Sequence, residues 1–261
     1  MKAIKNLLMI VNYQTVIVTA LAILSTFLCV KFELFANFPM TVVATAVIFP
    51  IVFSIGGAYK RRENALKEYG SLKSHGRAIF FASRDWLDNT DIKLQSSLRD
   101  KLKDLLVDAR DLFKEPLKKM EKNEKKVYRD FSDLSLIIKE FKKRGLSNGE
   151  VSRSNQYLSK MLVAFENIKH IYEYRTPKTL RTYSKVFIFL LPILYGPYFA
   201  HISLDFSSQL TYIIPALFSV VLVSLDNIQD QLENPFDQLG EDDVILNAEK
   251  FAKNLTLESK K

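Results

Sequence analysis

Acidic side chains cluster near the C-terminal end of the sequence, where their carboxylate oxygens could bind a cation. The members of this cluster are Asp237, Glu241, Asp242 and Asp243. Calcium prefers oxygen ligands of this kind. Residues 238–240 interrupt the run, however, and carboxylates beside a turn are more often solvated or cap the next helix. The four residues are therefore candidate calcium ligands, and beyond them we expect neither a metal site nor a cofactor.

A second polar set, Asp226, Asp230 and Glu233, lies where the last apolar segment ends and could supply an acid and a base at a membrane surface. Membrane enzymes usually gather several ionisable residues inside their spans. This sequence has almost none there, and no nucleophile with a nearby base stands out. We therefore predict that the chain is not an enzyme.

The histidines and the single cysteine do not form a site either. His75, His170 and His201 are far apart and have no regularly spaced partners of a ligand type, so we expect them on helix faces. Cys29 lies inside an apolar run and has no second cysteine with which to pair. We expect it to be a small buried residue.

The basic residues point to a membrane rather than to a nucleic acid. The net charge of +8 is spread through a segment that also contains many acidic residues. The sequence has no glycine-rich phosphate loop, no Cys/His spacing of a zinc site and no basic stretch interleaved with aromatic residues. Membrane-facing and stop-transfer roles explain the excess more simply, and we expect no nucleic-acid partner.

Four long uncharged runs predict the elements that must position these residues. Two lie between Lys5 and Lys31 and between Glu33 and Lys60, a third follows Lys185, and a fourth covers residues 206–225. A membrane helix needs roughly 20 apolar residues, so each run is long enough to span. A cleaved signal peptide is the alternative for the first run, but that run is too long and lacks a convincing cleavage site. Pro192, Gly196 and Pro197 should bend the third span.

Lys and Arg beside a span stay on the cytoplasmic side. Because they are nearly absent from the loops within each pair of spans, we place both termini and the middle of the chain in the cytoplasm. That middle has apolar residues at helical spacing, for example Leu98, Leu102, Leu105 and Leu106, and it predicts a helical bundle. The second span should continue into it as one long helix. The predicted class is therefore an all-α membrane protein with spans in 1–60 and 184–226, a cytoplasmic helical region in 61–183 and a cytoplasmic segment in 227–261.

Several motifs resemble those of the bestrophins. Ser224-Leu225-Asp226-Asn227, then Gln231-Leu232-Glu233-Asn234-Pro235-Phe236 and the acids that follow, are similar to the end of that family's fourth membrane helix. Thr176-Pro177, with Leu180 and Tyr183, is similar to the entry to its third span. Arg62-Glu63-Asn64-Ala65 and Phe81-Ala82-Ser83-Arg84 resemble the region after its second span. In animal bestrophins the matching acidic region binds calcium.

The resemblance implies a homopentameric ion channel whose pore is lined by the second span of each subunit. The family's neck has three apolar positions four residues apart. They fall on Phe53, Gly57 and Arg61 if the Arg-x-Asn-Ala match is followed, and on Val52, Gly56 and Lys60 if the Ala-Ser-Arg match is followed; Phe49 comes one turn earlier. The register stays open because Lys67, Glu68 and Tyr69 stand where the family usually has tryptophan and arginine, and the only tryptophan is Trp86.

A ring of Lys60 or Arg61 would favour chloride or other anions. Two alternatives remain open. The glycines could instead permit close packing of helices while the basic cluster anchors the topology, and the chain could then be a non-conducting scaffold. Bacterial bestrophins are also not uniformly anion channels, so a cation-selective homologue is the other alternative. We expect a bacterial inner membrane, with lipid, permeating inorganic ions and further copies of the chain as the only partners.

Overall fold

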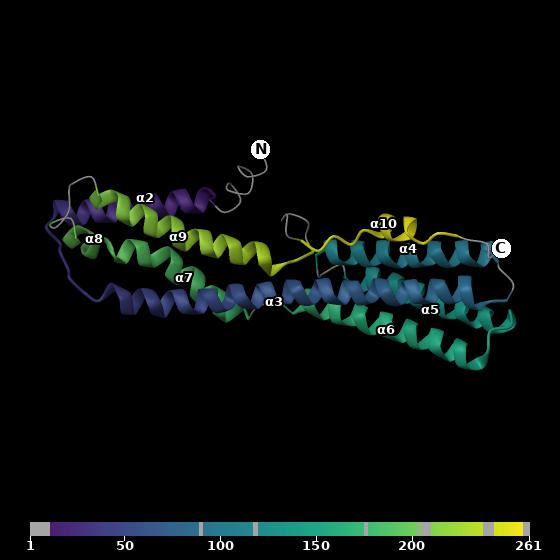
Figure 1. Ribbon diagram of the computed structural model, residues 1–261. Coiled ribbons are helices and arrows are strands. Elements are labelled where there is room, and N and C mark those ends of the chain that lie inside the picture. The colour runs from purple at the N-terminus through teal and green to yellow at the C-terminus, as the bar shows by residue number, and fades with distance from the viewer. Residues whose placement is uncertain are drawn as a thin grey trace. The chain divides into compact units, whose positions relative to one another are not determined.

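The computed structural model describes residues 11–88, 91–116, 120–174, 177–202, 204, 210–236 and 243–257. Its α-helices are α2 (Tyr13–Lys31), α3 (Met40–Phe81), α4 (Ile92–Lys114), α5 (Met120–Lys143), α6 (Asn148–Glu173), α7 (Lys178–Leu194), α8 (Gly196–Ile202), α9 (Leu210–Glu233) and α10 (Ala248–Lys253), and a π-helical turn, η1 (Ala82–Trp86), follows α3 (Figure 1). The described residues contain no strand. The predicted all-α class is therefore confirmed.

The chain forms two compact units, one made of Met1–Lys60 with Thr176–Glu233 and the other of Arg61–Arg175 with Asn234–Lys261. The division falls inside α3, whose 42 residues form one helix despite Pro50. The sequence prediction of a single long helix here is correct. It follows from the residues, because the charged continuation after Lys60 contains strong helix formers and no proline.

The first unit contains the apolar helices. Tyr13–Lys31, Thr41–Trp86 and Thr211–Glu233 each include a stretch long and apolar enough to cross a membrane. Thr179–Leu194 and Gly196–Ile202 pass the same test as a pair bent by 41° and provide a fourth crossing if they form one broken span. The expected bend at Pro192, Gly196 and Pro197 is therefore present. Cys29 is buried in α2, as expected.

Close packing between α2 and the bend fixes this unit locally. Ser25 Oγ donates a hydrogen bond to the Ile193 carbonyl oxygen at 2.8 Å, which occupies a backbone acceptor near the break. A Cβ atom added to Gly196 would lie 2.3 Å from Ser25 Oγ and 3.1 Å from the Ser25 carbonyl carbon. Only glycine fits at this crossing without a shift of the neighbouring helix.

Gly196→Ala should therefore destabilise the protein. Forcing a methyl group into a filled contact costs roughly 1–3 kcal/mol, so the thermal midpoint of the detergent-solubilised protein should fall by several degrees. Gly70→Ala is the matched control, since a Cβ there meets nothing within 4 Å and alanine is the better helix former. Equal melting temperatures for Gly196→Ala and the wild type would show that α2 and α8 do not meet as described.

The second unit is a helical bundle whose core comes from amphipathic α4, α5 and α6. The leucines singled out in the sequence are fully buried: Leu98, Leu102, Leu105 and Leu106 are at most 2% exposed. Burying each such side chain contributes about 1.5–3 kcal/mol. Phe113, Phe165 and Phe236 join the same core. The hydrophobic pattern therefore identified the buried faces correctly.

Local capping residues begin α4 and α6, and a glycine ends the turn after α5. Asp91 caps α4 by accepting hydrogen bonds from the backbone N–H groups of Lys93 and Leu94, and Ser147 caps α6 through the N–H of Glu150. Gly145 has φ +94°, a conformation that glycine adopts without strain, and it ends the turn after α5.

Candidate functional site

Six of the seven candidate pore-lining residues lie on one side of α3 in the first unit; the seventh is Arg61. Phe49, Val52 and Phe53 are 59%, 54% and 66% exposed. The opposite side of the same segment is buried through Val47, Ile51, Ser54 and Ala58, none more than 2% exposed. We call the exposed side, Phe49, Val52, Phe53, Gly56, Gly57 and Lys60, the outward face of α3. It is a mostly apolar helix surface that the rest of the subunit leaves uncovered.

The two glycines, Gly56 and Gly57, leave a part of the outward face without side chains. A Cβ atom added to Gly56 or Gly57 would meet nothing within 4 Å, so neither glycine is needed for packing inside the subunit. One turn earlier Phe49 and Phe53 pack edge to face, with ring centroids 4.9 Å apart. On the outward face the bulky aromatic pair is thus followed by the two glycines and then by the positive charge of Lys60.

The two series of candidate residues left open by the sequence differ in the exposure of their last members, Lys60 and Arg61. Residues three or four apart share a helix face, so Arg61, three residues after the buried Ala58, turns back toward the packed side. Arg61 is only partly exposed. Val52, Gly56 and Lys60 are all exposed and lie together on the outward face. Phe53 and Gly57 are exposed as well, so the two series differ only at Lys60 and Arg61, and the register stays a prediction.

The residues after this face belong to the second unit and are held within it. Arg62 Nη1 lies 2.6 Å from Glu63 Oε1, Asn64 is exposed, and Ala65 is fully buried in the core. Of the motif at the entry to the third span, Pro177 stands directly before α7, whereas Thr176 is outside the described residues.

The motif at the end of α9 forms a polar cluster with α2 and α7. Asp230 accepts hydrogen bonds from both Arg181 Nη2 and Lys185 Nζ, each at 2.7 Å. Asn12 Nδ2 donates to Asn227 Oδ1 at 2.9 Å. These pairs could not be predicted from local sequence patterns, because the partners are about 45 to 215 residues apart along the chain.

Two further side chains of α9, Asp226 and Gln229, are fully buried and do not take part in these hydrogen-bonded pairs. Both carboxylate oxygens of Asp226 and both polar atoms of Gln229 have no hydrogen-bond partner within the described part of the chain. Asp226 is 1% exposed and Gln229 is completely buried. A buried carboxylate and one held by two cations do not present an open acid and base to a substrate, so the enzyme hypothesis gains no support from Asp226 and Asp230.

No family model matches the sequence, and no curated protein matches it. Solved structures do match. Two crystal structures of point mutants of a bacterial bestrophin homologue from Klebsiella pneumoniae are similar to 92% and 93% of this chain and 97% of theirs, with TM-scores of 0.77 and 0.78 and 15% and 14% sequence identity. A third structure of that homologue covers 93% of this chain and 96% of its own at a TM-score of 0.78 and 14% identity.

The chain has the bestrophin fold. The resemblance seen in the sequence motifs is thus confirmed for the fold, over nearly the whole length of both chains. With its apolar helices, this fold makes the chain an integral membrane protein. The Asn234-Pro235-Phe236 turn of the bestrophin-like motif follows α9 directly, and the Phe236 ring stacks on Phe113 with centroids 5.1 Å apart.

The bestrophin-like acidic stretch is described only in part. Asp237, Glu241 and Asp242 lie outside the described residues, and Asp243 is partly buried. Within the described ranges, no group of three or more His, Cys, Asp and Glu residues is placed to hold a metal ion. His75 and His170 are on helix faces. His75 stacks on Tyr157 with a centroid distance of 6.1 Å, and His170 lies tilted against Tyr174 with a centroid distance of 4.6 Å.

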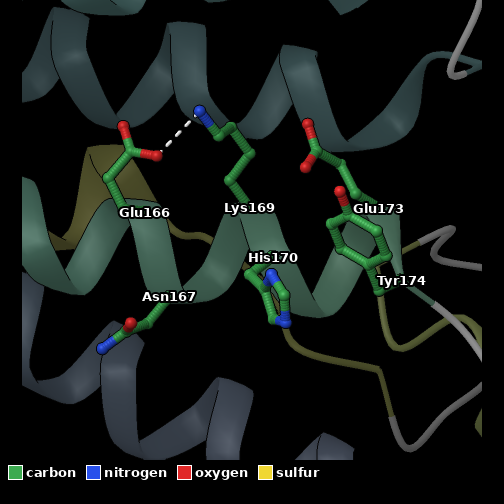
Figure 2. A pocket seen from close by; sticks show the side chains of 6 residues that line it. All are labelled: Glu166, Asn167, Lys169, His170, Glu173 and Tyr174. Atoms are coloured by element: carbon green, nitrogen blue, oxygen red, sulfur yellow. Dashed lines mark ion pairs between the residues drawn. The ribbon is translucent and has the colours of Figure 1, made fainter.

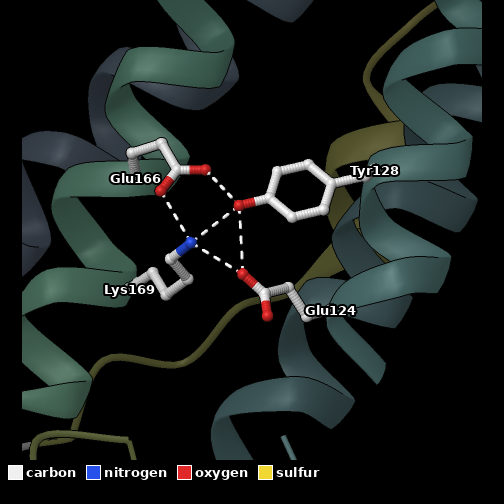
Figure 3. A network of polar contacts seen from close by, with 4 residues as sticks. All are labelled: Glu124, Tyr128, Glu166 and Lys169. Atoms are coloured by element: carbon white, nitrogen blue, oxygen red, sulfur yellow. Dashed lines mark hydrogen bonds and ion pairs between the residues drawn. The ribbon is translucent and has the colours of Figure 1, made fainter. Parts of the chain in front are cut away.

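An open groove runs along the end of α6, lined by Glu166, Asn167, Lys169, His170, Glu173 and Tyr174 (Figure 2). Its main charged groups are already paired (Figure 3). Lys169 Nζ lies 2.8 Å from Glu124 Oε1 and 2.7 Å from Glu166 Oε2. Burial and the hydrogen bond to Glu166 raise the pKa of Tyr128 to about 12. These contacts join α5 to α6, and the groove is best explained as the edge of a structural ion-pair network.

Proposed function

We propose that this chain forms a homopentameric channel of the bestrophin type, which conducts monovalent ions passively and favours chloride and other anions. The outward face of α3 carries the proposal. It is an apolar helix face, interrupted by two open glycines and followed by an exposed lysine, that its own subunit does not cover. In a symmetric ring such a face can border a central passage.

The composition of this face suits a pore better than a lipid contact. Glycines at positions without packing partners leave open space beside the helix. A helix surface that faces lipid is instead stabilised by larger apolar side chains that fill this space. Lys60 would repeat around a symmetric ring and place positive charge beside the passage, which attracts anions. Cation selectivity would require this charge to be screened or outside the conduction path.

Purified protein in planar bilayers tests the proposal. We expect stepwise currents that reverse near the chloride equilibrium potential in asymmetric salt, together with a mass of five chains by native mass spectrometry in detergent. A silent bilayer with a correctly assembled ring would favour the non-conducting scaffold. Currents that reverse near the cation equilibrium potential would show that the pore is of the cation-selective kind.

We also propose that both termini and the second unit face the cytoplasm of a bacterial inner membrane. The basic residues Lys60, Arg62 and Lys185 flank the apolar stretches on this side, as the positive-inside rule requires. A single cysteine at Ser147, in a background with Cys29 replaced, should be labelled by an impermeant thiol reagent only after the cells are opened. Labelling in intact cells would contradict this proposal and would place the second unit outside the cytoplasm.

A further inference from the structure

Two acidic residues one turn apart on α9 differ in their partners. Asp230 accepts two hydrogen bonds, from Arg181 Nη2 at its Oδ1 atom and from Lys185 Nζ at its Oδ2 atom, each at 2.7 Å. Asp226 is only 1% exposed, and neither of its carboxylate oxygens has a hydrogen-bond partner in the described part of the chain. Two cations of α7 thus share one acid, while the next acid along α9 holds neither of them.

A buried carboxylate without a hydrogen-bond partner is unfavourable. The amide groups beside Asp226 on α9 do not supply that partner. Asn227 Oδ1 accepts a hydrogen bond from Asn12 at 2.9 Å, and Gln229 is fully buried but its side chain makes no hydrogen bond among the described residues. The two acids and the two cations are equal in number, so no additional ion is needed to balance them. Only the distribution of the cations is uneven.

The opposite directions of α7 and α9 match the cations to the acids in order. At one end of the contact the two cations of α7 meet Asp230. At the other end Tyr195, which directly follows α7, packs against Phe218 of α9 with ring centroids 5.8 Å apart. Of the two cations Lys185 is nearer to this second end, and of the two acids Asp226 is nearer to it. Both pairs are spaced by four residues, which is about 6 Å along a helix.

Lys185 needs only a change of side-chain rotamers to approach the second acid. Its ammonium group ends a flexible four-carbon stem. The side chain is 34% exposed, so packing does not fix it in one position. Arg181 binds Asp230 through a separate carboxylate oxygen and keeps that acid paired when Lys185 leaves. In the second arrangement each acid therefore holds one cation, and the buried carboxylate of Asp226 gains a charged donor.

We propose that Lys185 exchanges between Asp230 and Asp226, so that α7 and α9 are joined in two alternative ion-pair states. In one state Asp230 holds both cations, and in the other Arg181 stays on Asp230 while Lys185 binds Asp226. The exchange moves one positive charge by about 6 Å along α9. A membrane potential biases such a movement when the helix crosses the bilayer. The inference does not depend on conduction, because all four residues belong to the first unit of one subunit.

A thermal double-mutant cycle tests whether Lys185 reaches Asp226. In the Asp230→Asn variant Lys185 has only Asp226 as an acceptor, so adding Asp226→Asn should lower the melting temperature of the full chain in detergent by about 6 °C or more. In the Asp230→Asn/Lys185→Met background the same change removes a buried charge without a partner, and the melting temperature should rise. Lys185→Gln replaces Lys185→Met if that variant does not fold. An equal effect of Asp226→Asn in both backgrounds would show that the two side chains do not meet.

Nuclear magnetic resonance tests the exchange in the unaltered cluster. In the full chain in detergent, with isotope-labelled lysine ε-methylene groups, the Lys185 signal is the one that Lys185→Arg removes. It should report two environments, as two signals or one broadened signal, and should become a single narrow signal in Asp226→Asn. Lys169, held by Glu124 and Glu166, is the internal control and should not change. A single narrow Lys185 signal that Asp226→Asn leaves unchanged would overturn the exchange.

Discussion

Replacing Gly56 with phenylalanine should abolish conduction, with single-channel currents lost at matched amounts of assembled protein. Nothing in the subunit lies within 4 Å of a Cβ at this position, so the new side chain does not disturb its own fold and must enter the open space on the outward face. If that face borders the proposed passage, each subunit contributes one phenylalanine side chain to it. Together these aromatic side chains fill the passage at the level of residue 56. Dewetting of a narrow apolar constriction then closes the pore.

Gly57→Phe is the matched control for this experiment. Gly57 is equally free of neighbours, but it lies one residue round the helix, on the flank of the outward face. We expect Gly57→Phe to retain most of the current. Block by Gly57→Phe alone would select the register of Phe53, Gly57 and Arg61, and conduction by both variants would remove the outward face from the pore. Size-exclusion chromatography before reconstitution separates block from failed assembly.

Much of the architecture was predictable because it depends on local chemistry. The 42 residues of α3 form one helix, since nothing between Lys60 and Phe81 competes with the helical backbone. Gly145 ends a turn because the turn needs a positive φ, which glycine adopts without steric cost. The bend after α7 follows from Pro192, Gly196 and Pro197, and the buried leucines of α4 follow from their spacing. Each of these features was readable from a short stretch of sequence.

The features that could not be predicted depend on partners distant along the chain. Asp130 stands in a strongly charged segment, and only the packing of α5 against its neighbouring helices buries it. Asp230 looks like an ordinary helix-end acid until Arg181 and Lys185 are brought to it. The register of the outward face was ambiguous by one residue because two motif matches disagreed. A shift of one residue turns a helix by about 100°, and the burial of neighbouring residues is sensitive to such a rotation.

Lys60→Glu should move the reversal potential toward the cation equilibrium potential by roughly 20 mV or more in a tenfold salt gradient, in which full selectivity for one monovalent ion corresponds to about 59 mV. Lys60 is exposed and lies on the same side of α3 as Val52 and Gly56. The substitution replaces one positive charge by one negative charge in every subunit of the proposed ring. Rings of charge at a pore mouth set the local concentration of permeating ions.

The same substitution at neighbouring positions separates a selectivity ring from a general surface charge. Arg61 is partly buried on the opposite side of the helix, and Arg62 is paired with Glu63 at 2.6 Å, so Arg61→Glu and Arg62→Glu should shift the reversal potential less. Salt screening adds an internal check. The shift caused by Lys60→Glu should shrink between 0.1 M and 1 M salt, because the screening length falls from about 10 Å to about 3 Å. An unchanged reversal potential with intact conductance would place Lys60 outside the conduction path, where the basic cluster only anchors the topology.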